Sequence, residues 1–519
     1  MTDLPDDIDQ LKALVCQLQA ANQAQAGSLA ELRAQIKQLL EQLNLSKSKR
    51  FGKQSEKADK GTFNEAEQQD ALPKPAPAHH KKGRQPLPAG LEREVQRHTL
   101  NAPHCDCCGE PLHTFGVETS ETLKIVPQKV SVIRHERTKY ACRQCEKRQT
   151  HSKIITAPAP PSLLPRTIAS PDTQAAIVTA KYVDALPLYR QTDILARSGI
   201  EISRSTLANW CVQLGRQVHG LVELMQAHLR NEPLICADET PVQVLHKGDR
   251  PAQSKSYMWV YRSGEFAAHP AVIFDYQPSR SGRCVADFLG DYSGYLLTDG
   301  YAAYDTLKQV RQAGCMAHAR RKFTDAQKVQ PGKKAGRAEQ GLTYFARLYA
   351  IEREARLLSP DERRRLRQEK AEPVLKDFHD GLTEASRTAL PKSAIGKAIS
   401  YTLNQWPKLI VYLEDGHISI DNNVTERNIL PFTTGRKNWL FSTSAEGAFA
   451  SANLYSLVMT CRANDINPYF YFPYIFTELP KRHPNDPLHD LLPWNVNMGV
   501  AVKKYRAEFR LTEFSAVMT

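Results

Sequence analysis

The chain has 519 residues, too many for one compact core, so several domains are expected. Its 69 lysine and arginine residues against 56 aspartate and glutamate residues give a net charge of +13, which favours polyanionic partners, above all nucleic acid. No apolar run approaches the roughly 20 residues that span a bilayer and the first residues are acidic, so we expect no membrane partner, no signal peptide and a cytoplasmic protein.

The first predicted element is a long helix with a heptad repeat from Leu11 to Leu43. Apolar residues occupy most a and d positions, and Asn22 stands at an a position, where paired amides specify a two-stranded register. The pattern predicts a coiled coil over 8–46 and self-association as a homodimer or higher oligomer. An amphipathic helix that packs on its own domain is the alternative.

A basic segment and then a Pro/Ala-rich segment follow at 47–95. Lys49, Arg50 and Lys53 lie around Phe51, and cations placed in this way bind DNA phosphates, although basic runs are also found simply solvated. The Pro/Ala-rich part is typical of a linker.

Two cysteine clusters predict a zinc-binding domain at 96–156. Each cluster contains a Cys-x-x-Cys knuckle, and four thiolates complete one tetrahedral structural Zn²⁺ site. The predicted ligands are Cys105, Cys108, Cys142 and Cys145. His104 and Cys107 adjoin the first knuckle and are alternative ligands, and unligated cysteines are the alternative to a metal site.

Three helices are predicted within 170–228, after a proline-rich joint. Gly199 is placed to end the second helix, and Ser203 to cap the third with its side-chain oxygen. Two helices joined by a short turn resemble a helix-turn-helix, in which Arg204 and Asn209 would face a major groove. A purely structural helical hairpin is the alternative.

The residues from 232 to 328 have the pattern of one α/β sheet. Three β-rich runs are followed by a helical segment, a strand in GYLLTDG, a helical segment over 301–310 and a short strand in AGCMAH. This βββαβαβ order is that of the ribonuclease-H-like fold. Its first strand carries Asp238 and its fourth ends at Asp299, where that fold carries two of its acids.

Acids at strand ends indicate chemistry on phosphate. Cleavage of a phosphodiester uses two divalent ions about 4 Å apart, and Mg²⁺ or Mn²⁺ prefers carboxylate oxygens. Asn422, Asn423 and Glu426 lie three and four residues apart on one predicted helical face; Glu426 is predicted as the third acid, and the asparagines as auxiliary groups. Glu239 and Asp275 are rival ligands, and alternation along the strand directs Glu239 to the opposite face.

The neighbouring residues predict contacts with the phosphate backbone. Pro431 is expected to stop the helix of Glu426, and Arg436 with Lys437, next to an aromatic residue, is expected to hold phosphates. His318 is a candidate for positioning a phosphate or a water molecule, whereas Cys315 is expected to pack in the core.

Far more residues separate Asp299 from Glu426 than one helix and one strand need, so an inserted helical domain is predicted, whose Arg and Lys side chains would reach DNA.

The fold class is therefore multidomain α+β. Its expected parts are a coiled coil (8–46), a basic segment and linker (47–95), a zinc-ribbon-like module (96–156), a helix-turn-helix-like segment (170–228), a ribonuclease-H-like catalytic core (232–328 and 415–465), the helical insertion (329–414) and a C-terminal element (466–519).

Several stretches together resemble one protein family. They are RFGKQSE after the leucine zipper, the paired cysteine knuckles, RTKYACRQC, ADETPV, LLTDGYAAY, GCMAHARRKF, DNNVTERNILPFTTGRKNWLFS and HDLLPWN. On these stretches nearly the whole chain resembles the insertion-sequence-66 family of bacterial transposases, a DDE-type group. The resemblance implies Asp238, Asp299 and Glu426 as catalytic acids that hold two Mg²⁺ or Mn²⁺ ions, and the four knuckle cysteines as ligands of one Zn²⁺.

The function that this resemblance implies is DNA transposition. The enzyme would bind the terminal inverted repeats of a mobile element, cleave a strand with water, and join the freed 3′ hydroxyl to target DNA. Accessory proteins encoded by the element would be further partners. The alternatives are a non-catalytic DNA-binding regulator and a ribonuclease-H-like nuclease without strand transfer.

Overall fold

The computed structural model describes residues 7–51, 130–140, 155–248, 250–329 and 336–500. The chain forms two units, Met1–Ala66 with Pro160–Thr519, and Glu67–Ala159. In the second unit the described residues include one antiparallel pair, β1 (Lys139–Tyr140) with β2 (Ile155–Thr156). The four predicted zinc ligands, His104, Cys107 and Lys53 lie outside the described residues. Among the described helices, none has the length and apolar character that crossing a bilayer requires.

The predicted N-terminal helix is present as α1 (Ile8–Phe51), which extends beyond the expected end of the coiled coil and includes Lys49 and Arg50. Its apolar heptad positions are exposed, with Leu18 at 56% and Ile36 at 57%. A row of exposed leucine and isoleucine side chains is costly in water unless a partner helix covers it, which favours dimerisation. Dimerisation through α1 stays a prediction.

The predicted helices that precede the sheet are present, and a further helix follows them. They are α4 (Pro171–Tyr182), α5 (Leu188–Ala196), α6 (Arg204–Gln217) and α7 (His219–Leu229). Ser203 caps α6 as predicted, because its side-chain oxygen accepts the Thr206 N–H at 3.1 Å, and Gly199 follows α5 with a φ of +75°. Leu207 and Trp210 of α6 are buried in the same hydrophobic cluster as the sheet.

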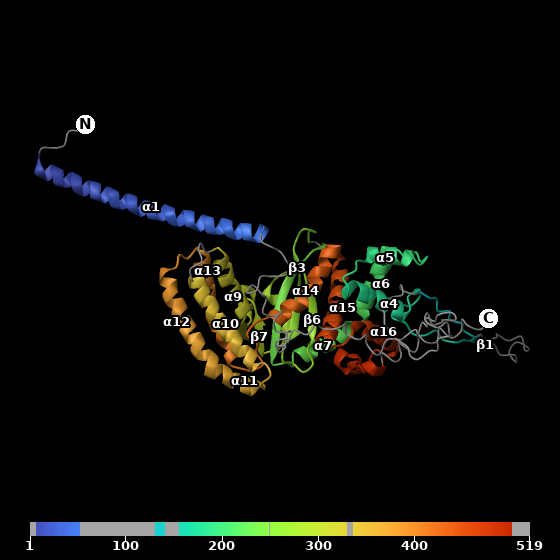
Figure 1. The fold of residues 1–519 in the computed structure, drawn as a ribbon. Coiled ribbons are helices and arrows are strands. Elements are labelled where there is room, and N and C mark those ends of the chain that lie inside the picture. Colours follow the sequence, from blue (N-terminus) through green and yellow to red (C-terminus); the bar gives the residue numbers. More distant parts are fainter. Residues whose placement is uncertain (1–6, 52–129, 141–154, 249, 330–335, 501–519) are drawn as a thin grey trace, which may run out of the picture. The chain divides into compact units, whose positions relative to one another are not determined.

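A five-stranded mixed sheet lies at the centre of the larger unit (Figure 1). Its strands are β3 (Leu234–Val242), β5 (Ser256–Ser263), β6 (Val272–Gln277), β7 (Tyr295–Thr298) and β8 (Arg311–Gly314), and α8 (Gly282–Leu289) precedes β7. The spatial order is β6-β5-β3-β7-β8, with β3, β5 and β6 antiparallel and β7 and β8 parallel to β3. The predicted sequence of three strands, a helix and two further strands is therefore present.

Two details of this region differ from the sequence prediction. The segment predicted as helical over 301–310 contains only the short 3₁₀ helix η1 (Ala302–Thr306), because buried Tyr304 bonds Glu239 and holds one tight turn. The last strand lies earlier than predicted and ends at Gly314, since Cys315 is already the N-cap residue of the following helix α9 (Met316–Lys328).

The helices after α9 pack together against the β7 and β8 side of the sheet (Figure 1). They are α10 (Arg337–Ala355), α11 (Pro360–Leu366), the π-helical turn η2 (Arg367–Ala371), α12 (Glu372–Thr388), α13 (Ala394–Leu409) and η3 (Ile410–Leu413). Some of their cations are structural rather than available to DNA. Arg367 is fully buried and donates to both carboxylate oxygens of Glu352, at 2.8 and 2.7 Å.

The last part of the chain returns to the sheet. Helix α14 (Asn423–Trp439) is followed by β9 (Ser442–Ser444), which pairs with β4 (Val244–His246), and then by α15 (Ala445–Ala463), α16 (Pro468–Glu478) and the turns η4 (Leu479–Lys481), η5 (His489–Leu491) and η6 (Pro493–Asn495). The hydroxyls of Ser456 and Thr460 on α15 accept the backbone N–H groups of Phe274 and Val272 at 2.8 and 3.0 Å. Helix α15 thereby covers the outer edge of β6, which would otherwise present unpaired donors.

The prediction that Pro431 stops the helix of Glu426 is wrong. Helix α14 passes through Pro431 and ends at Trp439. Proline removes one backbone donor, and Ile429 and Phe432 on either side of it are buried in the core, so tertiary packing carries the helix past this position.

Candidate active site

Asp238 lies on β3, and Asp299 directly follows the neighbouring parallel strand β7. Strand β3 pairs with β7 in a register that matches Leu234 with Tyr295 and Cys236 with Leu297. The ladder ends there, and Asp238 and Asp299 each lie two residues further along, Asp299 directly after β7. Because side chains alternate with a period of two, both positions continue the face on which Cys236 and Leu297 lie.

The Asp238 carboxylate is in an environment that disfavours its charge. Burial is the largest cause that raises the pKa of Asp238, the nearby carboxylates of Glu239, Asp299 and Glu426 add to the increase, and the Glu239 N–H, which donates to Asp238 Oδ1 at 2.8 Å, opposes it. Together they raise the pKa to about 8. The three predicted acids therefore interact electrostatically although they come from β3, the end of β7 and α14.

The Asp299 side chain is held by its own turn. The Tyr301 N–H donates to Asp299 Oδ1 at 2.9 Å, and the Thr298 hydroxyl donates to the Asp299 carbonyl at 3.0 Å. Gly300, between Asp299 and Tyr301, lies against Tyr401, and a Cβ on Gly300 would stand 2.8 Å from the Tyr401 hydroxyl. A larger residue after Asp299 would therefore displace the Tyr401 side chain of α13.

Glu426 lies in the first turn of α14 and contacts two residues of α9. Arg321 Nη2 donates to both Glu426 carboxylate oxygens at 3.3 and 3.2 Å, and His318 Nε2 lies 3.7 Å from Oε1. Burial lowers the pKa of His318, and the Glu426 charge opposes that shift. The predicted auxiliary histidine is therefore next to the third acid.

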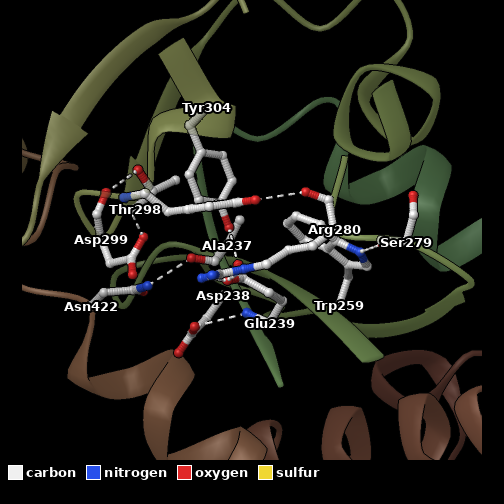
Figure 2. Close-up of polar contacts among 11 residues, drawn as sticks. Ala237, Asp238, Glu239, Trp259, Ser279, Arg280, Thr298, Asp299, Tyr304 and Asn422 are labelled. Carbon is white, nitrogen blue, oxygen red and sulfur yellow. Dashed lines mark hydrogen bonds and ion pairs between the residues drawn. The ribbon is translucent and has the colours of Figure 1, made fainter. Parts of the chain in front are cut away.

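The two predicted auxiliary asparagines begin α14 and are almost completely buried. Asn422 Nδ2 donates to the Ala237 carbonyl at 2.9 Å (Figure 2). The Asn422 N–H donates to Cys315 Sγ at 3.2 Å. Within the described structure, the Oδ1 atoms of Asn422 and Asn423 are buried without a hydrogen-bond partner. Asn422 thus ties the start of α14 to the residue before Asp238.

Sequence reasoning missed Asp421, which precedes these asparagines. Its buried carboxylate accepts the Tyr349 hydroxyl of α10 at 2.7 Å and both the N–H and Nδ2 of Asn423, at 3.0 and 2.8 Å. Burial raises the pKa of Asp421 to about 6, and the bond from Tyr349 opposes that shift. No local pattern links Tyr349 to Asp421, so only the DNN triplet could have drawn attention to this residue.

The two rival acids have partners of their own. Glu239 accepts Arg280 Nε at 2.6 Å and the Tyr304 hydroxyl at 2.9 Å, and its side chain is 2% exposed (Figure 2). Asp275 stands in register with Trp259, which stands in register with Glu239, so both acids face the side of the sheet opposite Asp238. Burial raises the pKa of Asp275 to about 6, and the Gln277 amide, donating at 2.9 Å, opposes the shift.

The predicted DNA contacts differ in their surroundings. Arg204 and Asn209 are exposed on α6, and Lys437 is exposed in the last turn of α14. Arg436, in contrast, donates to Thr240 Oγ1 at 3.2 Å and to the Pro241 carbonyl. It therefore anchors α14 to β3.

The acids offer suitable donors for a divalent ion, although they do not form a closed cage. In the part of the chain that the structure describes, no three His, Cys, Asp or Glu side chains stand close enough together to hold a metal ion. Carboxylate oxygens are the ligands that Mg²⁺ and Mn²⁺ prefer, and a cation beside Asp238 would offset the burial and repulsion that raise the pKa of this residue.

Comparison with known proteins identifies the family. Residues 166–450 match the family described as "Transposase IS66 family", residues 103–146 the "zinc-finger binding domain of transposase IS66", residues 456–494 the "IS66 C-terminal element", and residues 38–95 the "Transposase C of IS166 homeodomain".

Relatives in one bacterium match most of the chain. The uncharacterized protein y4qI of Sinorhizobium fredii (strain NBRC 101917 / NGR234) is 30% identical over 95% of this chain and 98% of its own length. The uncharacterized protein y4jD of the same strain is 34% identical over 75% of this chain and 78% of its own length. With the family match over 166–450, these relatives show that the chain belongs to the IS66 family of transposases.

Proposed function

We propose that this transposase cleaves and joins DNA strands with Asp238, Asp299 and Glu426 as its catalytic carboxylates, in a core of the ribonuclease-H-like type. The observation that carries the proposal is the placement of Asp238 on β3 and of Asp299 directly after the adjacent parallel strand β7, where Asp299 and Glu426 are both near enough to raise the pKa of buried Asp238. Such mutual repulsion is costly for folding and is typical of sites at which a cation is later held. The sheet order β6-β5-β3-β7-β8 supports the fold assignment.

The three carboxylates would hold two Mg²⁺ or Mn²⁺ ions, which when bound supply an activated water nucleophile and neutralise charge on the leaving oxygen. The chain itself orients the ligands. The backbone N–H groups of Glu239 and Tyr301 fix the Asp238 and Asp299 carboxylates, and Arg321 fixes that of Glu426. Fixed ligands reduce the reorganisation that the reaction needs.

The remaining predicted parts would bring DNA and a second subunit to this site. Cys105, Cys108, Cys142 and Cys145 would hold one structural Zn²⁺ in the zinc-finger region. Arg204 and Asn209 of α6 would contact the terminal inverted repeats, with Lys49, Arg50 and Lys53 as further phosphate contacts, and the exposed heptad face of α1 would pair two chains.

The proposal is tested by incubating the zinc-loaded full chain with labelled element ends and a target plasmid, with and without Mg²⁺. Joined products that require Mg²⁺ are expected. Cleaved ends without joining would indicate a nuclease, and bound but uncut ends a DNA-binding regulator. Asp299→Asn is expected to bind the ends and leave them uncut, and robust cleavage by this variant with Mg²⁺ would rule out the assignment of Asp299.

A further inference from the structure

Asn422 stands at the start of helix α14 but its side chain does not cap the helix. Asparagine is strongly preferred at the N-cap position, because its side-chain oxygen accepts a backbone N–H of the first helical turn. Asn422 is the N-cap residue of α14, yet its side chain forms no capping hydrogen bond. The Oδ1 atom of Asn422 is therefore not used for the local role that favours asparagine at this position.

The other end of the amide fixes the direction of Oδ1. Asn422 Nδ2 donates to the Ala237 carbonyl at 2.9 Å. In a reversed amide Oδ1 would face this carbonyl oxygen, and two acceptors repel each other, so the hydrogen bond assigns the nitrogen and the oxygen. The Asn422 N–H donates to Cys315 Sγ at 3.2 Å and holds the backbone as well. Oδ1 thus points in one defined direction.

Oδ1 of Asn422 is a buried acceptor without a partner in the part of the chain that the structure describes. The residue is 2% exposed, so bulk water does not reach this oxygen. A buried acceptor that has lost its hydrogen bonds to water is costly, and such an atom in a folded protein marks the place of an ion or an ordered water molecule.

This oxygen lies next to the acids. The ladder between β3 and β7 ends one residue before Ala237, and Asp238 directly follows Ala237. The Glu426 N–H donates to the Asn422 carbonyl at 3.2 Å, so one helical turn separates the third acid from Asn422. In Figure 2 the Asn422 side chain points toward the ends of β3 and β7, where Asp238 and Asp299 lie.

We infer that Asn422 Oδ1 is a ligand of a divalent ion at Asp238 and Asp299, in addition to the carboxylates. The inference rests on the proposed function, because it requires that these acids bind Mg²⁺ or Mn²⁺. Hard divalent ions take oxygen ligands, and asparagine carbonyls serve beside carboxylates in such sites. Among the described His, Cys, Asp and Glu side chains, no three stand close enough to hold a metal ion, so an amide oxygen extends a ligand set that the acids alone leave short.

A neutral ligand suits this position. The charges near Asp238 already raise the pKa of its carboxyl group, and a further carboxylate would add to that repulsion. An amide oxygen adds a ligand without adding charge. Asn423 Oδ1 is unpartnered as well, but Asn423 Nδ2 donates to Asp421 at 2.8 Å rather than to β3, so Asn422 is the residue tied to the strand of Asp238.

The test uses the zinc-loaded full chain and measures Mn²⁺ affinity by electron paramagnetic resonance. Asn422→Leu removes both ends of the amide and is expected to weaken Mn²⁺ binding roughly tenfold. Asn422→Asp keeps an oxygen and loses the Nδ2 donor, and it is expected to bind Mn²⁺ at least as tightly as wild type. The two variants thus separate a role of Oδ1 from a role of Nδ2.

Asn453→Leu is the matched control. Asn453 is also 2% exposed, and its Nδ2 donates to a backbone carbonyl, that of Gly215, at 2.8 Å. Its replacement removes the same kind of buried hydrogen bond on α15, and Mn²⁺ affinity is expected to equal that of wild type.

A second measurement does not depend on the folding of a variant. Wild-type chain is labelled with ¹³C at the amide carbon of its asparagines, and electron–nuclear double resonance is recorded on bound Mn²⁺. A resolved ¹³C coupling is expected, because a ligating amide places its carbon next to the ion. The coupling is expected to persist in Asn453→Leu and to disappear in Asn422→Asp.

Several results would overturn the inference. Equal loss of Mn²⁺ affinity in Asn422→Leu and Asn422→Asp would show that only the bond from Nδ2 to Ala237 matters. Wild-type affinity in Asn422→Leu, or the absence of a ¹³C coupling in wild type, would mean that Oδ1 bonds an ordered water molecule, and either result leaves the proposed function intact. Mn²⁺ binding that Asp238→Asn also leaves unchanged would instead contradict the proposed function itself.

Discussion

Asp238 and Glu239 are consecutive residues of β3 whose carboxylates have opposite surroundings. Glu239 is bonded by Arg280 and Tyr304, and its side chain is 2% exposed. Asp238 accepts the Glu239 N–H at 2.8 Å, and its burial and the charges of Glu239, Asp299 and Glu426 raise its pKa to about 8. The Glu239 carboxylate is thus paired with a cation inside the protein, whereas Asp238 forms no ion pair with the described side chains and its charged form is disfavoured.

This contrast predicts different effects for two substitutions that each replace a carboxyl group by an amide. Asp238→Asn is expected to lower strand cleavage by at least about a thousandfold with unchanged binding of element ends, because a metal-held carboxylate is lost. Glu239→Gln is expected to lower the free energy of unfolding by about 2 to 3 kcal/mol, since Arg280 loses its charged partner, and to retain cleavage once folded. Single-turnover cleavage and denaturant unfolding measure the two effects.

Equal loss of cleavage in both variants, measured well below their unfolding temperatures, would mean that Glu239 is itself a catalytic ligand.

Asp275 predicts a pH-dependent stability difference. Folding raises the pKa of Asp275 from 3.8 to about 6, so the folded state binds the Asp275 proton more tightly than the unfolded state does. The protonated group therefore contributes its full stability below pH 3.8, and this contribution is lost as the pH rises through about 6. Asparagine has no proton to lose. Asp275→Asn is therefore expected to match wild type near pH 4 and to exceed its stability by roughly 1 to 3 kcal/mol at pH 8.

Unfolding curves of wild type and Asp275→Asn across this pH range provide the measurement, with cleavage as the control. Retained cleavage is expected, because Asp275 faces the opposite side of the sheet from Asp238. The difference in the free energy of unfolding between Asp275→Asn and wild type is expected to grow from about pH 4 to about pH 8. A difference that shrinks or reverses over this range would contradict the predicted pH dependence.

Sequence reasoning could predict the strand order and the first two acids because both depend on local patterns. Each strand is a short apolar run, and Asp238 and Asp299 stand where such runs meet a polar residue. It was wrong at Pro431, because the burial of Ile429 and Phe432 depends on residues distant in sequence. Local propensity cannot include such tertiary contacts.

Arg436 and Lys437, which sequence reasoning treated alike, are expected to act differently. Arg436→Ala removes the bonds to Thr240 and Pro241 and should lower the free energy of unfolding by about 1 to 3 kcal/mol. Lys437→Ala leaves the fold unchanged and should reduce the salt dependence of DNA binding by about one counterion. Thermal unfolding and anisotropy titrations over a range of salt distinguish them, and an unchanged salt slope for Lys437→Ala would remove it from the DNA interface.

The bond from Tyr349 to Asp421 predicts that α10 supports the start of α14. Tyr349→Phe is expected to cost about 1 to 3 kcal/mol of stability, because buried Asp421 loses one of its donors, and to slow cleavage severalfold by loosening the turn before Glu426. Tyr344→Phe on the same helix is the matched control, since the Tyr344 ring stacks on Phe378 and would keep that contact. Cleavage by Tyr349→Phe at the wild-type rate would show that this bond serves stability alone.

Asp421 and Arg280 could not be assigned from sequence for the same reason. Their partners, Tyr349 and Glu239, are far away along the chain, and no spacing rule joins them. Glu426 was found through the helical spacing of the DNN triplet, although its partner Arg321 lies on α9. The composition of a site can thus be predicted from strand ends and helix faces, whereas the groups that hold it in place emerge from the fold.

The most direct test of the central claim is Mn²⁺ binding to the zinc-loaded full chain, followed by electron paramagnetic resonance. Mn²⁺ prefers oxygen ligands and does not compete for a thiolate zinc site, so the signal reports on the acids. Wild type and Asp275→Asn are expected to bind Mn²⁺ equally, and Asp238→Asn, Asp299→Asn and Glu426→Gln to bind it at least about tenfold more weakly. Undiminished Mn²⁺ binding by Asp238→Asn and Asp299→Asn would contradict the assignment of these carboxylates as the metal-holding site.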